Sequence, residues 1–145
     1  MKRIFFSTIL ILTFPTVFGQ TITNNILTSD HQNIVGTKIS LIPPKGFLKA
    51  TNFLGLQQTQ SGSTIMILDI PGPFAEVSKG LTKAGFLSQG VEVKEIENLT
   101  INNLPAILVT GEQNAYGNIY TKCVLCFGTD KETLNSSGKC NFENG

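Results

Sequence analysis

The chain has 145 residues, a length that is enough for one domain with one core. It contains 11 Lys and Arg against 10 Asp and Glu, so its charges nearly balance. Past its first residues it carries no cluster of basic side chains, so the electrostatic signature of a nucleic-acid-binding protein is missing. The near-neutral balance likewise predicts no attraction to an anionic membrane surface.

The first 19 residues have the pattern of a secretory signal peptide. Two basic residues precede an apolar run that extends to Phe18, and Val17 and Gly19 stand at the positions read for cleavage before Gln20. The rival interpretation, a transmembrane anchor, needs about 20 predominantly apolar residues, and this shorter run is interrupted by hydroxyl residues and by Pro15. We therefore expect export to the periplasm or the extracellular space, with no stable membrane insertion after cleavage.

The next part of the chain predicts a polar arm and then the start of a sheet. Residues 20–36 are polar and are expected to form an N-terminal arm, and the domain proper is expected over residues 37–134. Lys38–Ile42 predicts a strand that ends at Pro43, because proline cannot continue a ladder of hydrogen bonds. Phe53–Gln60 predicts a short edge strand. Thr64–Ile70 is a near-continuous apolar run, which is typical of a strand covered on both faces.

A helical segment is expected over Phe74–Gln89. Phe74, Val77, Leu81 and Ala84 recur at spacings of three and four, the period of one helical face. Pro73 suits a first helical position. We expect Gly80 to divide the segment into two short helices, the second capped by Thr82 and ended by Gly90.

Strands are expected to fill the rest of the domain. Val91–Glu97 and Leu99–Asn103 precede an Asn-Asn turn and a strand over Leu104–Gly111. Asn114–Gly117 predicts a hairpin loop, and Asn118–Phe127 predicts a central strand because both of its faces become apolar towards its end. This order predicts an α+β domain with a mainly antiparallel sheet and a helical segment on one face.

The end of the sequence predicts no element that could cover a second face of this sheet. Residues 135–145 are expected to form an irregular tail, because they show no helical period and few apolar side chains. Three alternatives remain: one face is bare, the N-terminal arm covers it, or the chain is truncated and lacks a C-terminal helix. A bare face would favour self-association or an unidentified protein partner.

The order of these markers resembles the PsbP-like fold family, which includes a bacterial domain of unknown function and a eukaryotic nuclear-import factor. The resemblance covers residues 37–134. It implies an αβα sandwich with a C-terminal helix that this sequence lacks, in a family whose known members are mostly non-catalytic binding or assembly proteins. No functional residue of a characterised member is matched. The residues that carry it are Ile39–Phe47, Ser63–Phe74, Leu81, Thr82, Gly90, Ile101–Gly111, Tyr120–Gly128, Asp130 and Lys131.

The three cysteines indicate neither a redox pair nor a zinc site. Cys123 and Cys126 lie three apart in a predicted strand, so their sulfurs are expected on opposite faces. A zinc site would need a second pair of ligands, and the only other candidates for that pair are Cys140 and His31. We expect Cys123 and Cys126 to act as small apolar residues. A disulfide between Cys126 and Cys140 remains an alternative.

Catalytic patterns are sparse. His31, the one histidine, falls in the polar arm, where a solvated side chain is the default. Phosphate-binding glycine loops and calcium loops are missing, so no metal or cofactor is predicted. Acid–base catalysis by two carboxylates leaves no sequence signature and stays an alternative. The acids available to it are Asp69, Glu76, Glu92, Glu95, Glu97 and Glu112.

The positive evidence favours binding. Glu112, Gln113, Asn114 and Tyr116 form a polar segment with one aromatic side chain between two strands, and loops held by a rigid sheet are frequent recognition sites. The sequence therefore predicts an exported, non-catalytic binding or assembly module of unknown ligand. The alternative is a carboxylate-based hydrolase acting outside the cytoplasm.

Overall fold

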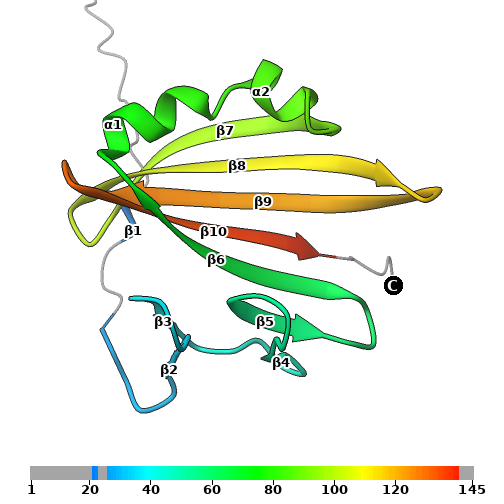
Figure 1. Ribbon diagram of the computed structural model, residues 1–145, viewed down its shortest axis with the longest axis horizontal. Helices are drawn as coiled ribbons and strands as arrows, with labels where there is room; N and C mark the ends of the chain where they lie inside the picture. Colours follow the sequence, from blue (N-terminus) through cyan, green and yellow to red (C-terminus); the bar gives the residue numbers. More distant parts are fainter. Residues whose placement is uncertain (1–20, 23–25, 141–145) are drawn as a thin grey trace, which may run out of the picture.

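The computed structural model describes residues 21–22 and 26–140, which form one large sheet, a small strand pair and a short helical segment (Figure 1). The predicted signal peptide and its cleavage point at Gly19–Gln20 lie outside the described residues. No helix in the described ranges is long and apolar enough to cross a bilayer. The strands are β1 (Thr21–Ile22), β2 (Gln32–Asn33), β3 (Ser40–Leu41), β4 (Leu48–Lys49), β5 (Gly55–Gln58), β6 (Ser63–Pro71), β7 (Val91–Ile101), β8 (Leu104–Ala115), β9 (Asn118–Gly128) and β10 (Glu132–Cys140).

The expected α+β class with a mainly antiparallel sheet is confirmed. The large sheet has the order β1-β7-β8-β9-β10-β6-β5-β4, and each neighbouring pair is antiparallel except β1 with β7. The strand predicted over Asn118–Phe127 is central, because β9 lies between β8 and β10. Gly55 lets β5 approach β6 closely, since a Cβ there would stand 1.9 Å from the carbonyl oxygen of Ile65.

The prediction of an irregular tail over 135–145 is wrong for its described part. Residues 132–140 form β10, which pairs with β9 on one side and with β6 on the other. Its small polar residues give little strand signal, but backbone groups held between two strands are satisfied by both ladders whatever the side chains. Thr133, which is fully buried, also donates its hydroxyl to the carbonyl of Gly72 at 2.9 Å. Residues 141–145 lie outside the described residues.

The expected separation of a polar arm over 20–36 from the domain is also wrong. The backbone of Thr21 pairs with that of Thr100, and β2 pairs with β3 through Gln32 and Leu41. Ile34 is only 5% exposed and packs in a core cluster with residues of the sheet. We call residues 26–42 the N-terminal hairpin, because they carry β2 and β3 and fold back over the sheet as a unit.

The two strands expected over Val91–Glu97 and Leu99–Asn103 are one strand, β7. Its register shifts at a bulge between Val93 and Glu95. The extra residue lets Val93 and Ile96 face the same side although they are three apart, and both pack under the helical segment. The Asn-Asn turn after β7 is confirmed, with φ of 49° at Asn102 and 64° at Asn103.

The helical segment divides near Gly80 as expected. It consists of α1 (Phe74–Val77), a 3-10 turn (Ser78–Gly80) and α2 (Lys83–Leu87). Thr82 caps α2 by accepting the backbone N–H of Gly85 at 3.1 Å, and Pro73 stands one position before α1 rather than inside it. Because the break resets the helical phase, Phe86 is buried while Ala84, expected on the apolar face, is exposed.

The cross-strand register assigns the side chains of the sheet to two faces. The helix-side face holds a core cluster of Phe86, Val91 and Val109. We call the other face the hairpin-side face, because the N-terminal hairpin packs on it. It carries two separate clusters, one of Ile34, Leu56 and Ile67 and the other of Leu99, Ile101 and Ala106. The N-terminal part of the chain therefore covers part of the second face, as one of the three alternatives expects.

The cysteines lie as the strand period predicts. Cys126 pairs with Ile107 and Asn135 on the helix-side face, and Cys123 faces the other side. The Cys126–Cys140 bridge is excluded by register, because Cys140 pairs with Thr121, which lies about 16 Å from Cys126 at roughly 3.3 Å per strand residue. Burial raises the pKa of the Cys126 thiol, which keeps it protonated and unreactive at neutral pH.

We predict that Ile67→Ala lowers the free energy of unfolding by about 2–5 kcal/mol, because the side chain of Ile67 in β6 is fully buried beneath the N-terminal hairpin. Leu68→Ala is the matched control in the same strand, since Leu68 faces the other side and is 44% exposed. Urea denaturation should show a loss of about 1 kcal/mol or less for the control. Equal losses in the two variants would contradict this assignment of faces.

Alkylation provides a second check on the register of β9. In native protein at pH 7, iodoacetamide should leave Cys126 unmodified, because the side chain is inaccessible and its raised pKa suppresses the thiolate. In urea the same cysteine should be modified fully. Peptide mass mapping of both samples measures this, and equal modification in the two states would show that Cys126 is exposed in the folded protein.

Candidate functional site

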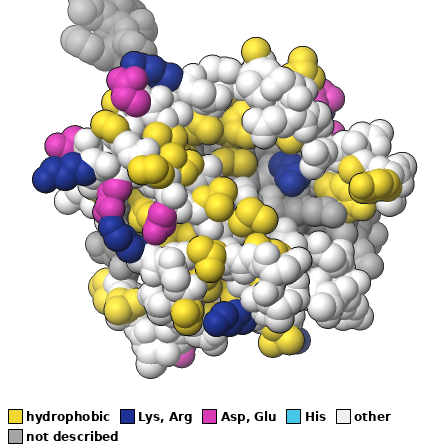
Figure 2. Space-filling model, in the orientation of Figure 1, with side chains coloured by type: hydrophobic (Ala, Val, Ile, Leu, Met, Phe, Trp, Pro, Cys, Tyr) yellow, Lys and Arg dark blue, Asp and Glu magenta, His cyan; other side chains and the backbone are white. Residues whose placement is uncertain are grey.

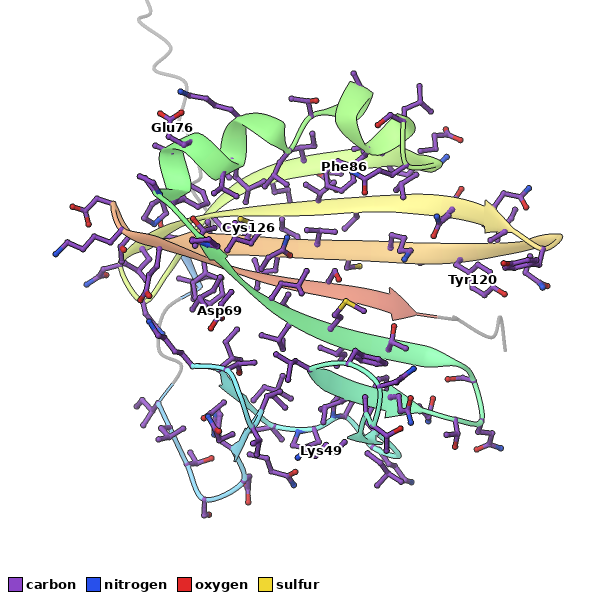
Figure 3. All side chains as sticks on the ribbon, viewed as in Figure 1. Lys49, Asp69, Glu76, Phe86, Tyr120 and Cys126 are labelled. Atoms are coloured by element: carbon purple, nitrogen blue, oxygen red, sulfur yellow. The ribbon has the colours of Figure 1, made fainter. Side chains whose placement is uncertain are left out.

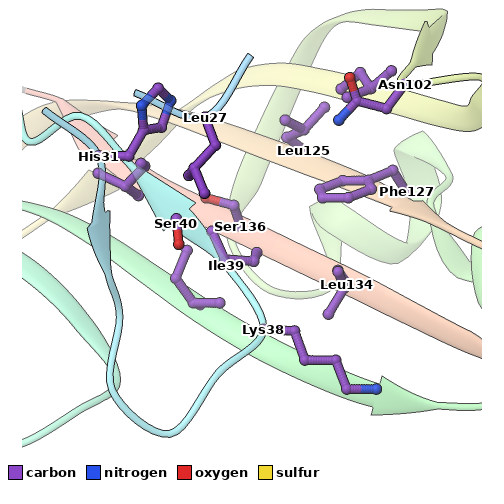
Figure 4. A pocket seen from close by; sticks show the side chains of 13 residues that line it. Leu27, His31, Lys38, Ile39, Ser40, Asn102, Leu125, Phe127, Leu134 and Ser136 are labelled. Carbon is purple, nitrogen blue, oxygen red and sulfur yellow. The ribbon is translucent and has the colours of Figure 1, made fainter. Parts of the chain in front are cut away.

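The main cavity in the described part of the chain lies between the N-terminal hairpin and the sheet (Figure 4). Its volume is about 470 Å³. It occupies the gap between the two clusters of the hairpin-side face, where the hairpin bridges from one to the other without filling the space. The apolar walls come from both clusters and from β10: Ile39, Leu41, Ile67, Leu125, Phe127 and Leu134.

Uncharged polar groups stand among these apolar walls. Ser40 comes from β3, Ser136 from β10 and Asn102 from the β7–β8 turn. Throughout the described residues, no protein group forms a hydrogen bond with these three side chains. Each can both donate and accept a hydrogen bond, so together they could orient a polar group of a bound molecule.

A charged group marks one side of the cavity. Lys38 lines it, and its ammonium donates a hydrogen bond to the carboxylate of Glu132 in an ion pair. This hydrogen bond, the charge of Glu132 and, more weakly, the charge of Asp69 hold the pKa of Lys38 above its ordinary value. Asp69, labelled in Figure 3, follows Ile67 by two residues in β6, so it lies on the hairpin-side face, and it is exposed. The positive charge of Lys38 is therefore already compensated by protein carboxylates.

His31 differs from the solvated arm histidine that the sequence predicts. Its side chain is half-buried and lines the cavity. Its Nδ1 accepts the backbone N–H of Thr28 at 3.1 Å and lies 2.9 Å from the hydroxyl of the same residue. A backbone N–H can only donate, so the neutral ring carries its hydrogen on Nε2. His31 thus fixes the start of the N-terminal hairpin and offers one further donor.

The four binding residues predicted from sequence do not form one site. Glu112 and Asn114 face the hairpin side, whereas Gln113 faces the helix side, where it donates to the carbonyl of Gln89 at 3.3 Å. Tyr116 is fully exposed at the tip of the β8–β9 turn, with φ of 53°. Because strand β8 extends to Ala115, successive side chains alternate between faces instead of converging.

Two of the acidic residues predicted as catalytic candidates face each other, and a lysine bridges them. Glu92 and Glu112 are direct cross-strand partners, and both line a shallow hollow. The Nζ atom of Lys94 lies 2.8 Å from Oε1 of Glu92 and 3.2 Å from Oε2 of Glu112. The hydrogen bond from Lys94 and its charge lower the pKa of Glu92, which stays ionised at neutral pH. Glu76 is paired with Lys79 in α1 and the following turn. Among the described residues that line the main cavity there is no Asp or Glu.

No group of three or more His, Cys, Asp or Glu side chains that could hold a metal ion is found in residues 21–22 and 26–140. The residues of the main cavity were missed from the sequence because they come from segments up to about a hundred positions apart. One signal was present: the apolar Ile39 and Leu41 alternate with polar residues at the start of the domain, which is typical of a strand that packs one face on a sheet.

The helix-side face is only partly covered. The helical segment lies over β7 and β8, and Figure 2 shows hydrophobic side chains (yellow) gathered over the middle of the sheet beside it. Leu68 is 44% exposed there, and Met66, Ile70 and Val124 are half-buried on the same face. In the described part of the chain, no group donates a hydrogen bond to the side-chain oxygen of Asn135, which is buried in this region. These features form an apolar strip beside a smaller hollow of about 170 Å³ that Phe86, Val91 and Val124 line.

The sequence was compared with models of known protein families and with curated proteins. No family model matches the chain. No curated protein matches it either.

Proposed function

We propose that this chain is an exported, non-catalytic binding module whose ligand occupies the cavity between the N-terminal hairpin and the sheet. The observation that carries the proposal is the cavity itself. It is a concave space of about 470 Å³, partly open to solvent, that lies between two core clusters. That volume, with apolar walls and a few polar groups, is typical of small-molecule sites.

Filling the cavity would stabilise the fold. A ligand in the cavity would cover apolar wall groups that otherwise face solvent. The ligand would also join the cluster around Ile67 to the cluster around Ile101. Binding is thus expected to raise the stability of the folded state by mass action.

Export rests on the sequence of residues 1–20. The basic start, the apolar run and the cleavage pattern at Gly19–Gln20 support a periplasmic or secreted location. The resemblance to the PsbP-like fold family over residues 37–134 is a second support, since its known members are mostly non-catalytic binding or assembly proteins. Membership in that family is part of the proposal.

The test is binding of N-phenyl-1-naphthylamine, a neutral apolar fluorophore, to the full chain. We expect saturable binding with one site per chain, because the probe suits an apolar cavity of this size. Ser136→Leu should weaken binding by at least about tenfold, since the larger side chain occupies the cavity. Fluorescence titration measures both affinities.

Ser137→Leu is the matched control for this test. Ser137 follows Ser136 in β10 but faces the helix side, so the same substitution leaves the cavity open. Thermal unfolding monitored by circular dichroism shows whether both variants fold. Loss of binding in Ser137→Leu alone would place the probe on the apolar strip, and no binding to the native chain would refute the proposal.

A second candidate function, a carboxylate-based hydrolase, rests on one observation: Glu92 and Glu112 face each other across β7 and β8 and line a hollow. Lys94 bridges them and lowers the pKa of Glu92, which does not suit a general acid. We expect Glu112→Gln to leave the rates on a panel of nitrophenyl esters, phosphates and glycosides equal to those of the native chain. A rate above the blank that Glu112→Gln abolishes would favour the hydrolase instead.

A further inference from the structure

The charges at the cavity point to the class of ligand it takes, an inference that rests on the proposed function. The groups concerned are Ser40, Ser136, Asn102, Lys38 and His31, and Figure 4 shows them with the apolar walls.

The available polar groups are uncharged. Ser40 of the N-terminal hairpin and Ser136 of β10 both line the cavity, and their hydroxyls make no hydrogen bond within the described protein. A hydroxyl can donate to a carbonyl or accept from an alcohol. A neutral polar group between them would thus regain the hydrogen bonds that it loses on leaving water.

The one lysine of the cavity is not available to an anion. Lys38 is ion-paired with Glu132, and Asp69 adds a second negative charge on the same face of the sheet. An anionic head group would have to displace Glu132 and would stand near two carboxylates. A desolvated charge without a partner is costly, and repulsion by like charges adds to that cost.

Binding of a cationic head group inside the cavity is also unfavourable. No acidic side chain is among its described lining residues, and Glu132 is engaged by Lys38. The ammonium of Lys38 would repel a second cation brought into the same space. Both signs of charge are therefore disfavoured, while the apolar walls and the two hydroxyls remain.

We propose that the cavity binds an uncharged amphipathic molecule, with an apolar body against Ile67, Leu125 and Phe127 and a hydroxyl or carbonyl group at Ser40 and Ser136. Long-chain alcohols and monoacylglycerols are of this chemical class. The ion pair of Lys38 with Glu132 is the element that excludes charged analogues, so it sets the selectivity of the site.

Three decyl compounds with the same ten-carbon chain test this selectivity. At pH 7, 1-decanol is neutral, decanoate is an anion and decylammonium is a cation. Each is titrated against N-phenyl-1-naphthylamine bound to the full chain. We expect 1-decanol to displace the probe at a concentration at least ~10-fold lower than either ion, because only the ions leave a desolvated charge unpaired.

The variant Glu132→Gln tests the role of the ion pair. It frees Lys38 to bind an anion, so decanoate should displace the probe at a several-fold lower concentration than from the native chain, with 1-decanol unchanged. Glu92→Gln is the matched control, because Glu92 is also a carboxylate paired with a lysine but does not line the cavity. It should leave all three displacement curves unchanged.

The outcomes separate this inference from the proposed function. Probe binding with decanoate or decylammonium as the best competitor would overturn the neutral ligand class and leave the binding module standing. Probe binding that no decyl compound displaces would overturn it as well. An unchanged response to decanoate in Glu132→Gln would refute the role given to the ion pair. A native chain that binds no probe would refute the proposed function itself.

Discussion

The double pairing of β10 is the constraint on which the rest of the structure depends. It joins β9 to β6, and thereby connects the β7–β8–β9 meander to the β4–β5–β6 end of the sheet. Thr133 at its start is also tied to Gly72, just before α1, which fixes where the helical segment begins. A strand of small polar residues can hold this place because the two neighbouring ladders, and not its side chains, satisfy its backbone.

The cavity is a consequence of this central strand. The two clusters of the hairpin-side face belong to the two ends of the sheet, around Ile67 and around Ile101, and β10 separates them with side chains as small as Ser136. The N-terminal hairpin spans the gap because Ile34 anchors it in one cluster. A larger residue at position 136 would fill the space, so the small side chain is what leaves room for a ligand.

In our proposal, the charges around the cavity decide which molecules it binds. Surface ion pairs contribute little to stability, and the pair of Lys38 with Glu132 is solvent-exposed on both sides. Its effect is better sought in selectivity, because it neutralises the one lysine that lines the cavity while leaving the hydroxyl groups available. The same arrangement recurs at Lys94 with Glu92 and Glu112, where it occupies the carboxylates that a hydrolase would need.

The sequence by itself determined the local features of this protein: the α+β class, the strand predicted over Thr64–Ile70, the Thr82 cap, the turn at Asn102 and the opposite faces of Cys123 and Cys126. Each of these follows from the period or the backbone preference of neighbouring residues. Only the tertiary structure decided that residues 132–140 form a central strand, that the N-terminal hairpin covers a face, and that Lys38, Ser40 and Ser136 line one cavity. These features depend on which strands far apart in the sequence pair with each other. The weak strand propensities of small polar residues do not indicate which strands those are.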